Sequence, residues 1–270
     1  MVMAILIAIT TPLNVFAQSY IVYNLEDGNV LKASGEEESL PIASVSKLMT
    51  VLIVCEKIQT GDFTLDTVVV APSNFKNPGG SSFEIKPNDQ YTVWQLICGA
   101  LVVSGNDAAT LLGMYVGGTE AKFAVMMNDR AAALGMKHDW FHSASGLNDD
   151  GYDNYASASD LKLLMTELYT KHWDIIGPIV KVKNLSELGF NRSKGSTNPI
   201  LALDNRCIGL KTGYTTPAGY CGTYIFDCNG KKLAVVLLGA KNPKERNAEV
   251  INLANEGELL LNQQLNVMNP

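Results

Sequence analysis

Strand patterns occur near both ends of the chain. Early on, the segments from Tyr20 to Asn24 and from Val30 to Ala33 flank Asp27-Gly28, a dipeptide that favours a tight hairpin turn. Late in the chain, Asn229-Gly230 separates two strand patterns in the same way. We therefore expect an antiparallel hairpin at each end, with the late strands over residues 209–212, 220–227 and 232–239.

Helical spacing dominates the residues between these strands. From Ser44 onwards, apolar residues recur with a helical period, and neither Pro nor Gly interrupts them before Gly61. A loop rich in Ser, Asp, Asn and Gly is expected over 139–158. Further helices are expected over residues 94–103, 107–114, 120–134, 159–168 and 245–263.

Strands at both ends and helices between them predict an α+β fold. Its antiparallel sheet is made from distant segments, is flanked by helices and carries an inserted all-helical lobe. With 270 residues and no long low-complexity linker, we expect one folded domain over residues 18–270. The expected sheet lobe covers about 18–65 and 200–270, the expected helical lobe about 66–199, and no β-rich domain is expected after them.

The first seventeen residues form an apolar stretch that ends in Val15-Phe16-Ala17, and they predict a signal peptide over residues 1–17. The protein is then expected in the cell envelope or outside the cell. No Lys or Arg precedes the stretch and Pro12 breaks it, so a buried first strand or helix stays open as an alternative.

Near the C-terminus, Leu259 to Leu261 lack a basic partner face and are expected in the core rather than as a membrane anchor.

Charge and composition exclude several classes of function. A net charge of −6 and a pI near 5.1 provide no basic surface, so nucleic acid is not expected as a partner. The five cysteines show no CxxC or CxxH spacing, which argues against a zinc site and a full disulfide framework. A single bridge from Cys207 to another cysteine stays open. The three histidines fit no triad or metal motif, and the Asp-rich stretch 139–153 misses the calcium-loop pattern, so no metal or cofactor is predicted.

Three short motifs carry candidate chemistry. They are Ser44-Val-Ser-Lys47, Ser104-Gly-Asn106 and Lys211-Thr-Gly213, which match the S-x-x-K, S-x-N and K-T-G set of penicillin-binding proteins and β-lactamases. Each motif alone is weak, since a Ser three residues before a Lys is common at helix starts. Their order and spacing suit a helix, a helical lobe and a returning strand, and together they predict one site.

The spacing of the first motif predicts an activated serine. Residues i and i+3 share one helix face, so the amine of Lys47 is expected beside the hydroxyl of Ser44, where it can accept the proton. Lys47 can act as a base only if its pKa is lowered, and burial together with the nearby cation of Lys211 would lower it. Ser44 is therefore the predicted nucleophile and Lys47 the predicted general base.

The other two motifs supply candidate proton-transfer and binding groups. We expect Ser104 to relay a proton to the leaving amine, and Asn106 to hold either the substrate amide or Lys47. Lys211 and Thr212 offer a cation and a hydroxyl to a substrate carboxylate, and Gly213 lets the substrate backbone approach closely. The predicted oxyanion hole consists of the backbone N–H groups of Ser44 and Tyr214.

The motifs and their surroundings resemble the D-alanyl-D-alanine carboxypeptidases, the S11 serine peptidases among the low-molecular-mass penicillin-binding proteins. The resemblance extends from about Tyr20 to Leu261. Its segments are 41–50, Ser104-Gly-Asn-Asp-Ala-Ala109, Gly118-Thr-Glu120, Met127-Asn128, Leu134-Gly-Met136, 209–215 and Ala218-Gly-Tyr-Cys221.

This resemblance implies a serine β-lactamase-like, penicillin-binding fold with a D,D-peptidase catalytic domain. It further implies that Ser44 is acylated by peptidoglycan stem peptides ending in D-Ala-D-Ala, that D-alanine is released, and that β-lactam antibiotics are covalent inhibitors. Arg246 matches an arginine that the family uses to attract the substrate carboxylate. The Ser143-Ala-Ser-Gly-Leu147 loop departs from the family, because many members carry histidine before Gly-Leu.

Other functions stay open at this point. A class A β-lactamase shares the three motifs but needs a loop glutamate, and no glutamate lies between Glu120 and Glu167. A D,D-endopeptidase would use the same residues on a different substrate. A non-catalytic β-lactam- or peptidoglycan-binding module is disfavoured by intact Ser44, Lys47 and Lys211.

Overall fold

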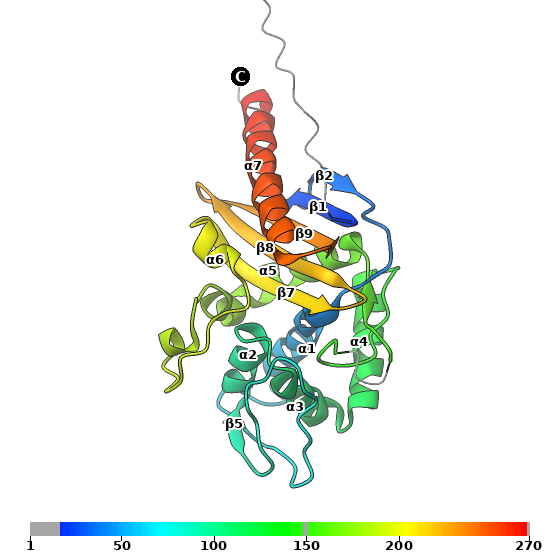
Figure 1. Ribbon diagram of the computed structural model, residues 1–270, viewed down its shortest axis with the longest axis vertical. Coiled ribbons are helices and arrows are strands. Elements are labelled where there is room, and N and C mark those ends of the chain that lie inside the picture. The colour runs from blue at the N-terminus through cyan, green and yellow to red at the C-terminus, as the bar shows by residue number, and fades with distance from the viewer. Residues whose placement is uncertain (1–16, 148–150, 269–270) are drawn as a thin grey trace, which may run out of the picture.

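The structure is a computed structural model that describes residues 17–147 and 151–268. All but the last residue of the predicted signal peptide lie outside the described residues. A five-stranded antiparallel sheet joins the two ends of the chain (Figure 1). Its strands, in spatial order, are β2 (Val30–Ser34), β1 (Ser19–Asn24), β9 (Lys231–Ala240), β8 (Gly219–Cys228) and β7 (Cys207–Thr215).

The central strand β9 explains why the sheet is covered on both faces. Its residues from Leu233 to Leu238 are all apolar and fully buried. Because side chains alternate along a strand, Leu233, Val235 and Leu237 join one core while the residues between them join the other. Helix α7 (Pro243–Met268) packs on the first face, and α5 (Ala158–Val180) packs on the second.

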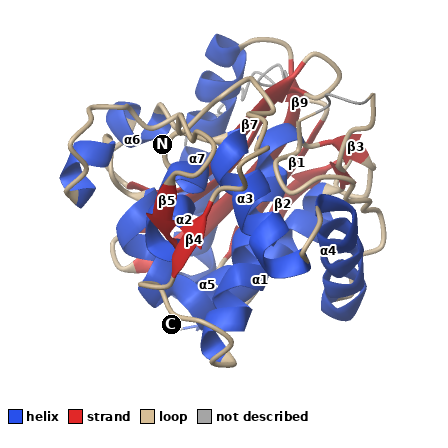
Figure 2. Ribbon diagram, turned by 90° about the horizontal axis from the view of Figure 1, so that it is seen from below, coloured by secondary structure: helices blue, strands red, loops and turns tan. Residues whose placement is uncertain are grey.

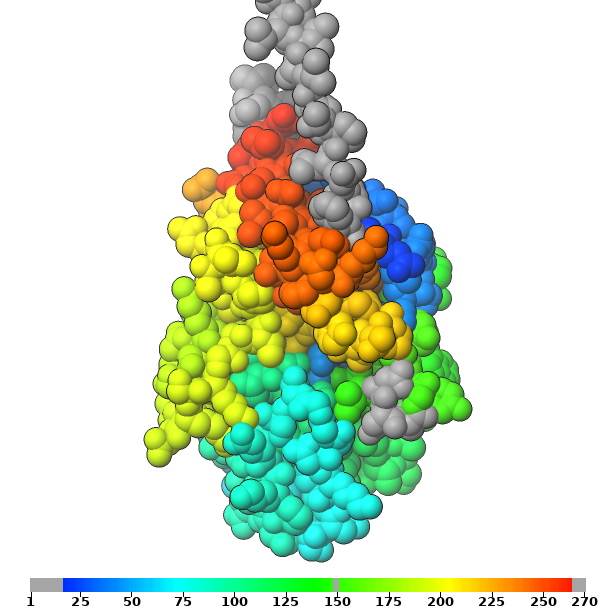
Figure 3. Space-filling view, in the orientation of Figure 1, coloured from blue at the N-terminus to red at the C-terminus, as the bar shows by residue number. Residues whose placement is uncertain are grey.

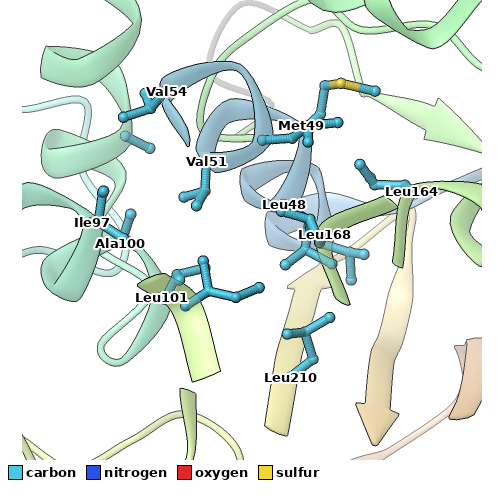
Figure 4. Packing of buried hydrophobic residues seen from close by; sticks show 14 of the residues in the cluster. Leu48, Met49, Val51, Val54, Ile97, Ala100, Leu101, Leu164, Leu168 and Leu210 are labelled. Atoms are coloured by element: carbon cyan, nitrogen blue, oxygen red, sulfur yellow. The ribbon is translucent and has the colours of Figure 1, made fainter. Parts of the chain in front are cut away.

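Helix α1 (Lys47–Gln59) forms the centre of the larger core. A short 3₁₀ turn, η1 (Ala43–Ser46), leads into it, and every residue from Lys47 to Cys55 is buried. Such an all-round buried helix needs neighbours on each side. Figure 4 shows α1 residues Leu48 and Val51 among apolar side chains of surrounding elements. The neighbouring helices are α2 (Val93–Leu101), α3 (Asn106–Gly117), α4 (Glu120–Leu134) and α5.

Local signals explain where several helices begin. Thr92 and Ser157 each form a capping box at the start of α2 and α5, and Thr119 caps α4 by accepting from the N–H of Lys122. The left-handed Gly135 ends α4. Short elements complete the fold, some visible in Figure 2: β3 (Leu40–Pro41), β4 (Val68–Val70), β5 (Gln90–Thr92), β6 (Tyr155–Ala156), η2 (Leu185–Leu188) and α6 (Ile200–Leu203).

The fold agrees with the predicted antiparallel sheet flanked by helices, with several differences in detail. Helix α5 runs to Val180 rather than residue 168, and although it falls in the part expected as a helical lobe, it packs on β1, β7 and β9. All five cysteines are free and buried, so the bridge from Cys207 that the sequence left open is absent. Within residues 17–147 and 151–268, no helix is long and apolar enough to cross a membrane.

Candidate active site

The turn before α1 brings Ser44 and Lys47 together. In a 3₁₀ turn the side chains at i and i+3 eclipse, and here Lys47 Nζ lies 2.7 Å from Ser44 Oγ. Ser44 is half-buried, whereas Lys47 is fully buried. Figure 3 shows a small blue area, the colour of the early part of the chain, enclosed where cyan, green and yellow segments meet. The predicted contact between Ser44 and Lys47 is therefore present.

Two further groups hold the Lys47 amine. Lys47 Nζ donates to Asn106 Oδ1 and to the Ser145 backbone carbonyl, both at 2.7 Å. The Asn106 amide is itself oriented, because its Nδ2 donates to the Gly79 carbonyl at 2.8 Å. A neutral amine has two N–H bonds and one lone pair. If both N–H bonds go to these acceptors, the lone pair faces the Ser44 hydroxyl, as a general base requires.

Burial and nearby positive charge lower the pKa of both buried lysines. The pKa of Lys47 is lowered well below its usual value, mainly by burial and then by the charge of Lys211, while Asp107 opposes the shift. Burial, helped by Arg246, lowers the pKa of Lys211 to about 7. Two like charges oppose each other's protonation, so the pair favours a state with one neutral and one charged lysine. With Lys47 neutral and Lys211 cationic, Lys47 could accept a proton from Ser44 and Lys211 could bind a carboxylate.

Ser104 joins Lys211 in a second cluster. Lys211 Nζ donates to Ser104 Oγ at 2.9 Å and to the Thr212 carbonyl at 2.6 Å, and both lysine and serine are buried. Ser104 lies in the turn between α2 and α3 with a φ of 59°. Ala43, next to Ser44, has a φ of 46°. Such conformations are costly for residues other than glycine and persist where the surrounding structure holds them, commonly at functional sites.

The remaining predicted site residues lie on β7, apart from Arg246 on α7. The Thr212 hydroxyl donates to the Thr197 carbonyl at 3.0 Å, so it must rotate before it can donate to a substrate. Tyr214 is exposed and stacks on its cross-strand neighbour Tyr220, with ring centroids 4.4 Å apart. Arg246 is buried, and its guanidinium lies 5.9 Å from the centre of the Tyr220 ring. Its positive charge helps to lower the pKa of Lys211.

Gly213 has a different neighbour from the one predicted. A Cβ at this position would lie 2.8 Å from the Ile42 carbonyl and 3.1 Å from the Ser44 nitrogen. The close approach that needs glycine is therefore between β7 and the turn that carries Ser44, rather than only with a substrate backbone. The contact sets β7 directly beside the backbone N–H of Ser44, one of the two predicted oxyanion-hole donors.

Sequence reasoning missed the loop that holds Asn106. The buried Asp107 carboxylate accepts from the Phe83 N–H at 2.7 Å, the Ile85 N–H at 3.0 Å and the Ser82 hydroxyl at 2.6 Å. The Asn106 N–H donates to the Ser81 carbonyl in the same loop. These bonds fix residues 79–85 against the start of α3. The only signal in the sequence was an acidic residue in the first turn of a helix, which usually indicates capping.

The second missed feature is the role of the loop Ser143-Ala-Ser-Gly-Leu147, which the sequence marked only as a departure from the resemblance. Its Ser145 carbonyl holds Lys47, and its Ala144 carbonyl accepts from Thr50 on α1 at 2.7 Å. Gly146 has a φ of 71°, and a Cβ there would lie 2.0 Å from the Ala43 carbonyl, so the loop packs tightly on the turn before α1. The loop makes these contacts through backbone carbonyls. Every residue has a carbonyl, so no sequence motif predicts such contacts.

Comparison with known proteins identifies a family. A family model described as D-alanyl-D-alanine carboxypeptidase matches residues 7–242. The chain is 31% identical over 243 residues to the D-alanyl-D-alanine carboxypeptidase DacF of Bacillus subtilis (strain 168), with 88% of this chain and 61% of the relative covered. It is 33% identical over 228 residues to DacB2 of Mycobacterium tuberculosis, with 82% of this chain and 74% of the relative covered.

Solved structures show the same fold. Penicillin-Binding Protein D2 from Listeria monocytogenes, in its cefotaxime-bound form, superposes with a TM-score of 0.81 at 30% identity over 92% of this chain and 99% of the other. The chain spans only about 61% of the length of DacF. The family model nevertheless covers most of the sequence. From this match and the shared fold, the chain belongs to the D-alanyl-D-alanine carboxypeptidase family, peptidase family S11.

Proposed function

We propose that this protein is a serine D-Ala-D-Ala carboxypeptidase that removes the terminal D-alanine from peptidoglycan stem peptides through an acyl-enzyme on Ser44. The observation that carries the proposal is the environment of Lys47. Its buried amine lies 2.7 Å from the Ser44 hydroxyl, its pKa is lowered, and its two other contacts are pure acceptors. That arrangement supports a lysine base beside a serine nucleophile.

In the acylation step, Ser44 Oγ attacks the carbonyl carbon of the penultimate D-alanine and its proton passes to Lys47. The backbone N–H groups of Ser44 and Tyr214 stabilise the oxyanion. Collapse of the tetrahedral intermediate breaks the C–N bond. Ser104 gives its proton to the leaving amine and regains one from protonated Lys47, which becomes neutral again. The contact between Ser104 and Lys211 at 2.9 Å supports this role, because a neighbouring cation favours proton release from the hydroxyl.

The terminal carboxylate of the substrate binds on the β7 side of Ser44, where Gly213 packs against the turn η1. Lys211 and Arg246 supply positive charge there, and Thr212 supplies a hydroxyl after rotation. D-alanine then leaves the site and a water molecule takes its place. Lys47 takes a proton from that water as it attacks the ester, and the proton returns to Ser44 as the C–O bond breaks.

β-Lactams are proposed to react at the same serine. The Listeria relative carries cefotaxime or ampicillin in its solved structures. A β-lactam ring opened by Ser44 would leave an ester, with its carboxylate beside Lys211. We further propose that the protein is secreted and acts in the cell envelope, where it takes part in peptidoglycan biosynthesis and the maintenance of cell shape.

The test is release of free D-alanine from an N-acetylated Lys-D-Ala-D-Ala peptide. The wild type is expected to release it, and Ser44→Ala is expected to lower the rate by about 10³-fold or more. Ser34→Ala, an exposed serine at the end of β2, is the matched control and should retain the rate.

Each alternative predicts a different outcome. Cross-linked peptide dimers without free D-alanine would contradict water as the acceptor. Fast turnover of penicillin without peptide cleavage would indicate a β-lactamase. Absence of both activities and of any penicillin adduct would indicate a binding module and overturn the proposal.

A further inference from the structure

Residues 190–197 lie across the loop that holds Asn106, and we call this segment the strap. It follows η2 and precedes α6, and neither the three motifs nor the segments of the family resemblance include it. Figure 3 shows yellow and cyan segments in contact on this side of the molecule. The side chains of the strap that contact residues 82–84 alternate along it, and they are Phe190, Arg192 and Lys194.

The strap and the start of α3 hold Phe83 from two directions. Arg192 Nη1 donates to the Phe83 carbonyl at 2.6 Å, and its guanidinium lies 4.2 Å from the centre of the Phe83 ring. The Asp107 carboxylate accepts from the N–H of the same residue at 2.7 Å. Hydrogen bonds to charged groups are the stronger ones. Arg192 and Asp107 therefore fix the two polar groups of the Phe83 backbone with opposite charges.

Lys194 fixes the residues on each side of Phe83. Its Nζ donates to the Ser82 carbonyl at 3.1 Å and pairs with the Glu84 carboxylate at 2.6 Å. Glu84 has a φ of 70°, a conformation that is costly for a residue with a Cβ and that needs support from its surroundings. The strap supplies contacts at three consecutive positions of the loop.

The strap is itself anchored at both ends. At its start, the Phe190 ring stacks on Trp94 of α2 with ring centroids 5.5 Å apart. At its end, the Thr197 N–H donates to the Val102 carbonyl at 3.0 Å, and the Thr197 carbonyl accepts from Thr212 of β7. An anchored segment can hold a neighbouring loop in place, whereas a loose one would only follow it.

The loop held by the strap carries the acceptors that orient Asn106. The Gly79 carbonyl accepts from Asn106 Nδ2 at 2.8 Å, and the Ser81 carbonyl accepts from the Asn106 N–H at 2.7 Å. Asn106 Oδ1 in turn accepts from Lys47 Nζ at 2.7 Å. A shift of the loop therefore moves the amide that orients the amine of Lys47.

We propose that Arg192 is a positioning residue for the acylation of Ser44, because it holds the loop 79–85 where the Asn106 amide orients the Lys47 amine. This inference rests on the proposed function, since it concerns the same proton transfer. Within residues 17–147 and 151–268, the hydrogen bond and the ion pair of Arg192 go to Phe83 and Glu84. Arg192 therefore acts through the loop and is not a catalytic residue.

The experiment measures acylation by a labelled penicillin and separates the dissociation constant of the first complex from the rate constant of acylation. Arg192→Ala is expected to lower the rate constant about tenfold, because misplaced reacting groups react more slowly. The dissociation constant should stay within about twofold of the wild type, because the groups proposed to bind the carboxylate lie on β7 and α7. An unchanged rate constant would overturn the proposal.

Two further variants sharpen this comparison. Lys183→Ala removes an exposed cation seven residues before the start of the strap, and it should retain the wild-type rate constant. Arg192→Lys keeps the charge but not the flat group that stacks on Phe83, so we expect a loss of about threefold. Should Arg192→Ala not fold, Arg192→Lys decides, and a rate constant equal to that of the wild type would overturn the proposal.

A double-mutant cycle distinguishes positioning from a general effect on the structure. Asn106→Ala removes the amide through which Arg192 is proposed to act. In that background Arg192→Ala should lower the rate constant by less than about twofold, because the effects of coupled residues do not add. A further tenfold loss would mean that the two residues act independently, and it would contradict the proposal.

The positioning role and the proposed function fail in different ways. Absence of any penicillin adduct on the wild type would overturn the function itself. Normal acylation of the wild type together with an unchanged rate constant in Arg192→Ala would overturn the role of Arg192 alone.

Discussion

At the scale of single residues, two buried lysines in different charge states form the proposed machinery. Lys47 must be neutral to accept the proton of Ser44, and Lys211 must be cationic to bind a carboxylate. Burial lowers the pKa of both, but Lys211 lowers that of Lys47 further. As pH rises, kcat/KM should first increase as Lys47 loses its proton and then fall as Lys211 loses its own near pH 7.

Arg246→Gln tests this order. Arg246 helps to lower the pKa of Lys211, so its removal is expected to raise that pKa and move the alkaline limb of the kcat/KM profile to higher pH. The variant should also raise KM, because one cation near the substrate carboxylate is lost. The measurement is D-alanine release between pH 5 and 9.5. Lys244→Gln, an exposed cation two residues earlier in α7, is the control, and an alkaline limb that stays in place or moves down would contradict the assignment.

The residue types in the site were predictable from the sequence, but the contacts that hold these residues in place were not. The i, i+3 spacing predicted the contact between Ser44 and Lys47, which the structure has at 2.7 Å. For Asn106 the sequence allowed two partners, and the structure gives Lys47. Ser145 could not be found, because it acts through its carbonyl, which every residue possesses.

At the scale of elements, strand β7 and the turn η1 are fitted to each other at Gly213. The strand passes so close to Ile42 and Ser44 that no side chain fits between them. Because backbone atoms line this contact, they can give way only if the strand or the turn moves. The position of Ser44 relative to β7 therefore depends on glycine at position 213, where even the methyl group of alanine would not fit.

Gly213→Ala is expected to separate β7 from Ser44 by a few tenths of an ångström or more and to lower the rate of acylation by labelled penicillin at least tenfold. Small misplacements of reacting groups cost about this much or more. Gly195→Ala is the control, since the nearest atom to a Cβ there is 3.9 Å away. An acylation rate for Gly213→Ala within twofold of the wild type would contradict this fit.

Long elements with a clear period were predictable, and short ones were not. The helix over 120–134 was predicted at its observed bounds. β3 and β6 have two residues each, too few for any period to be visible. Helix α5 was predicted too short because polar residues follow Leu168, yet Ile176 and Ile179 continue its buried face.

At the scale of the whole molecule, the two cores join segments from the two ends of the chain. Strand β1 pairs with β9, and α7 packs over both. Gly257 on α7 makes this packing close, because a Cβ there would lie 2.7 Å from Val22 Cγ1 and 2.9 Å from Leu233 Cδ2. The hairpin signals at the two ends of the chain predicted a sheet but not this single contact between distant residues.

Gly257→Ala is expected to lower the free energy of unfolding by about 1–3 kcal/mol, the usual cost of overpacking. In an open helix the same change would be favourable by about 1 kcal/mol. Asn252→Ala on the same helix is the control and should be neutral or slightly stabilising. Urea unfolding measures both, and a Gly257→Ala protein more stable than the wild type would contradict close packing of α7.

The most direct test of the central claim is the site of the acyl-enzyme. The protein is incubated with a labelled penicillin and digested with trypsin, and the peptides are analysed by mass spectrometry. The label is expected on the peptide that contains Ser44, at one equivalent per chain, and both Ser44→Ala and Lys47→Met should abolish it or slow it by orders of magnitude. A label on another serine, or unchanged labelling of Ser44→Ala, would contradict the assignment of nucleophile and base.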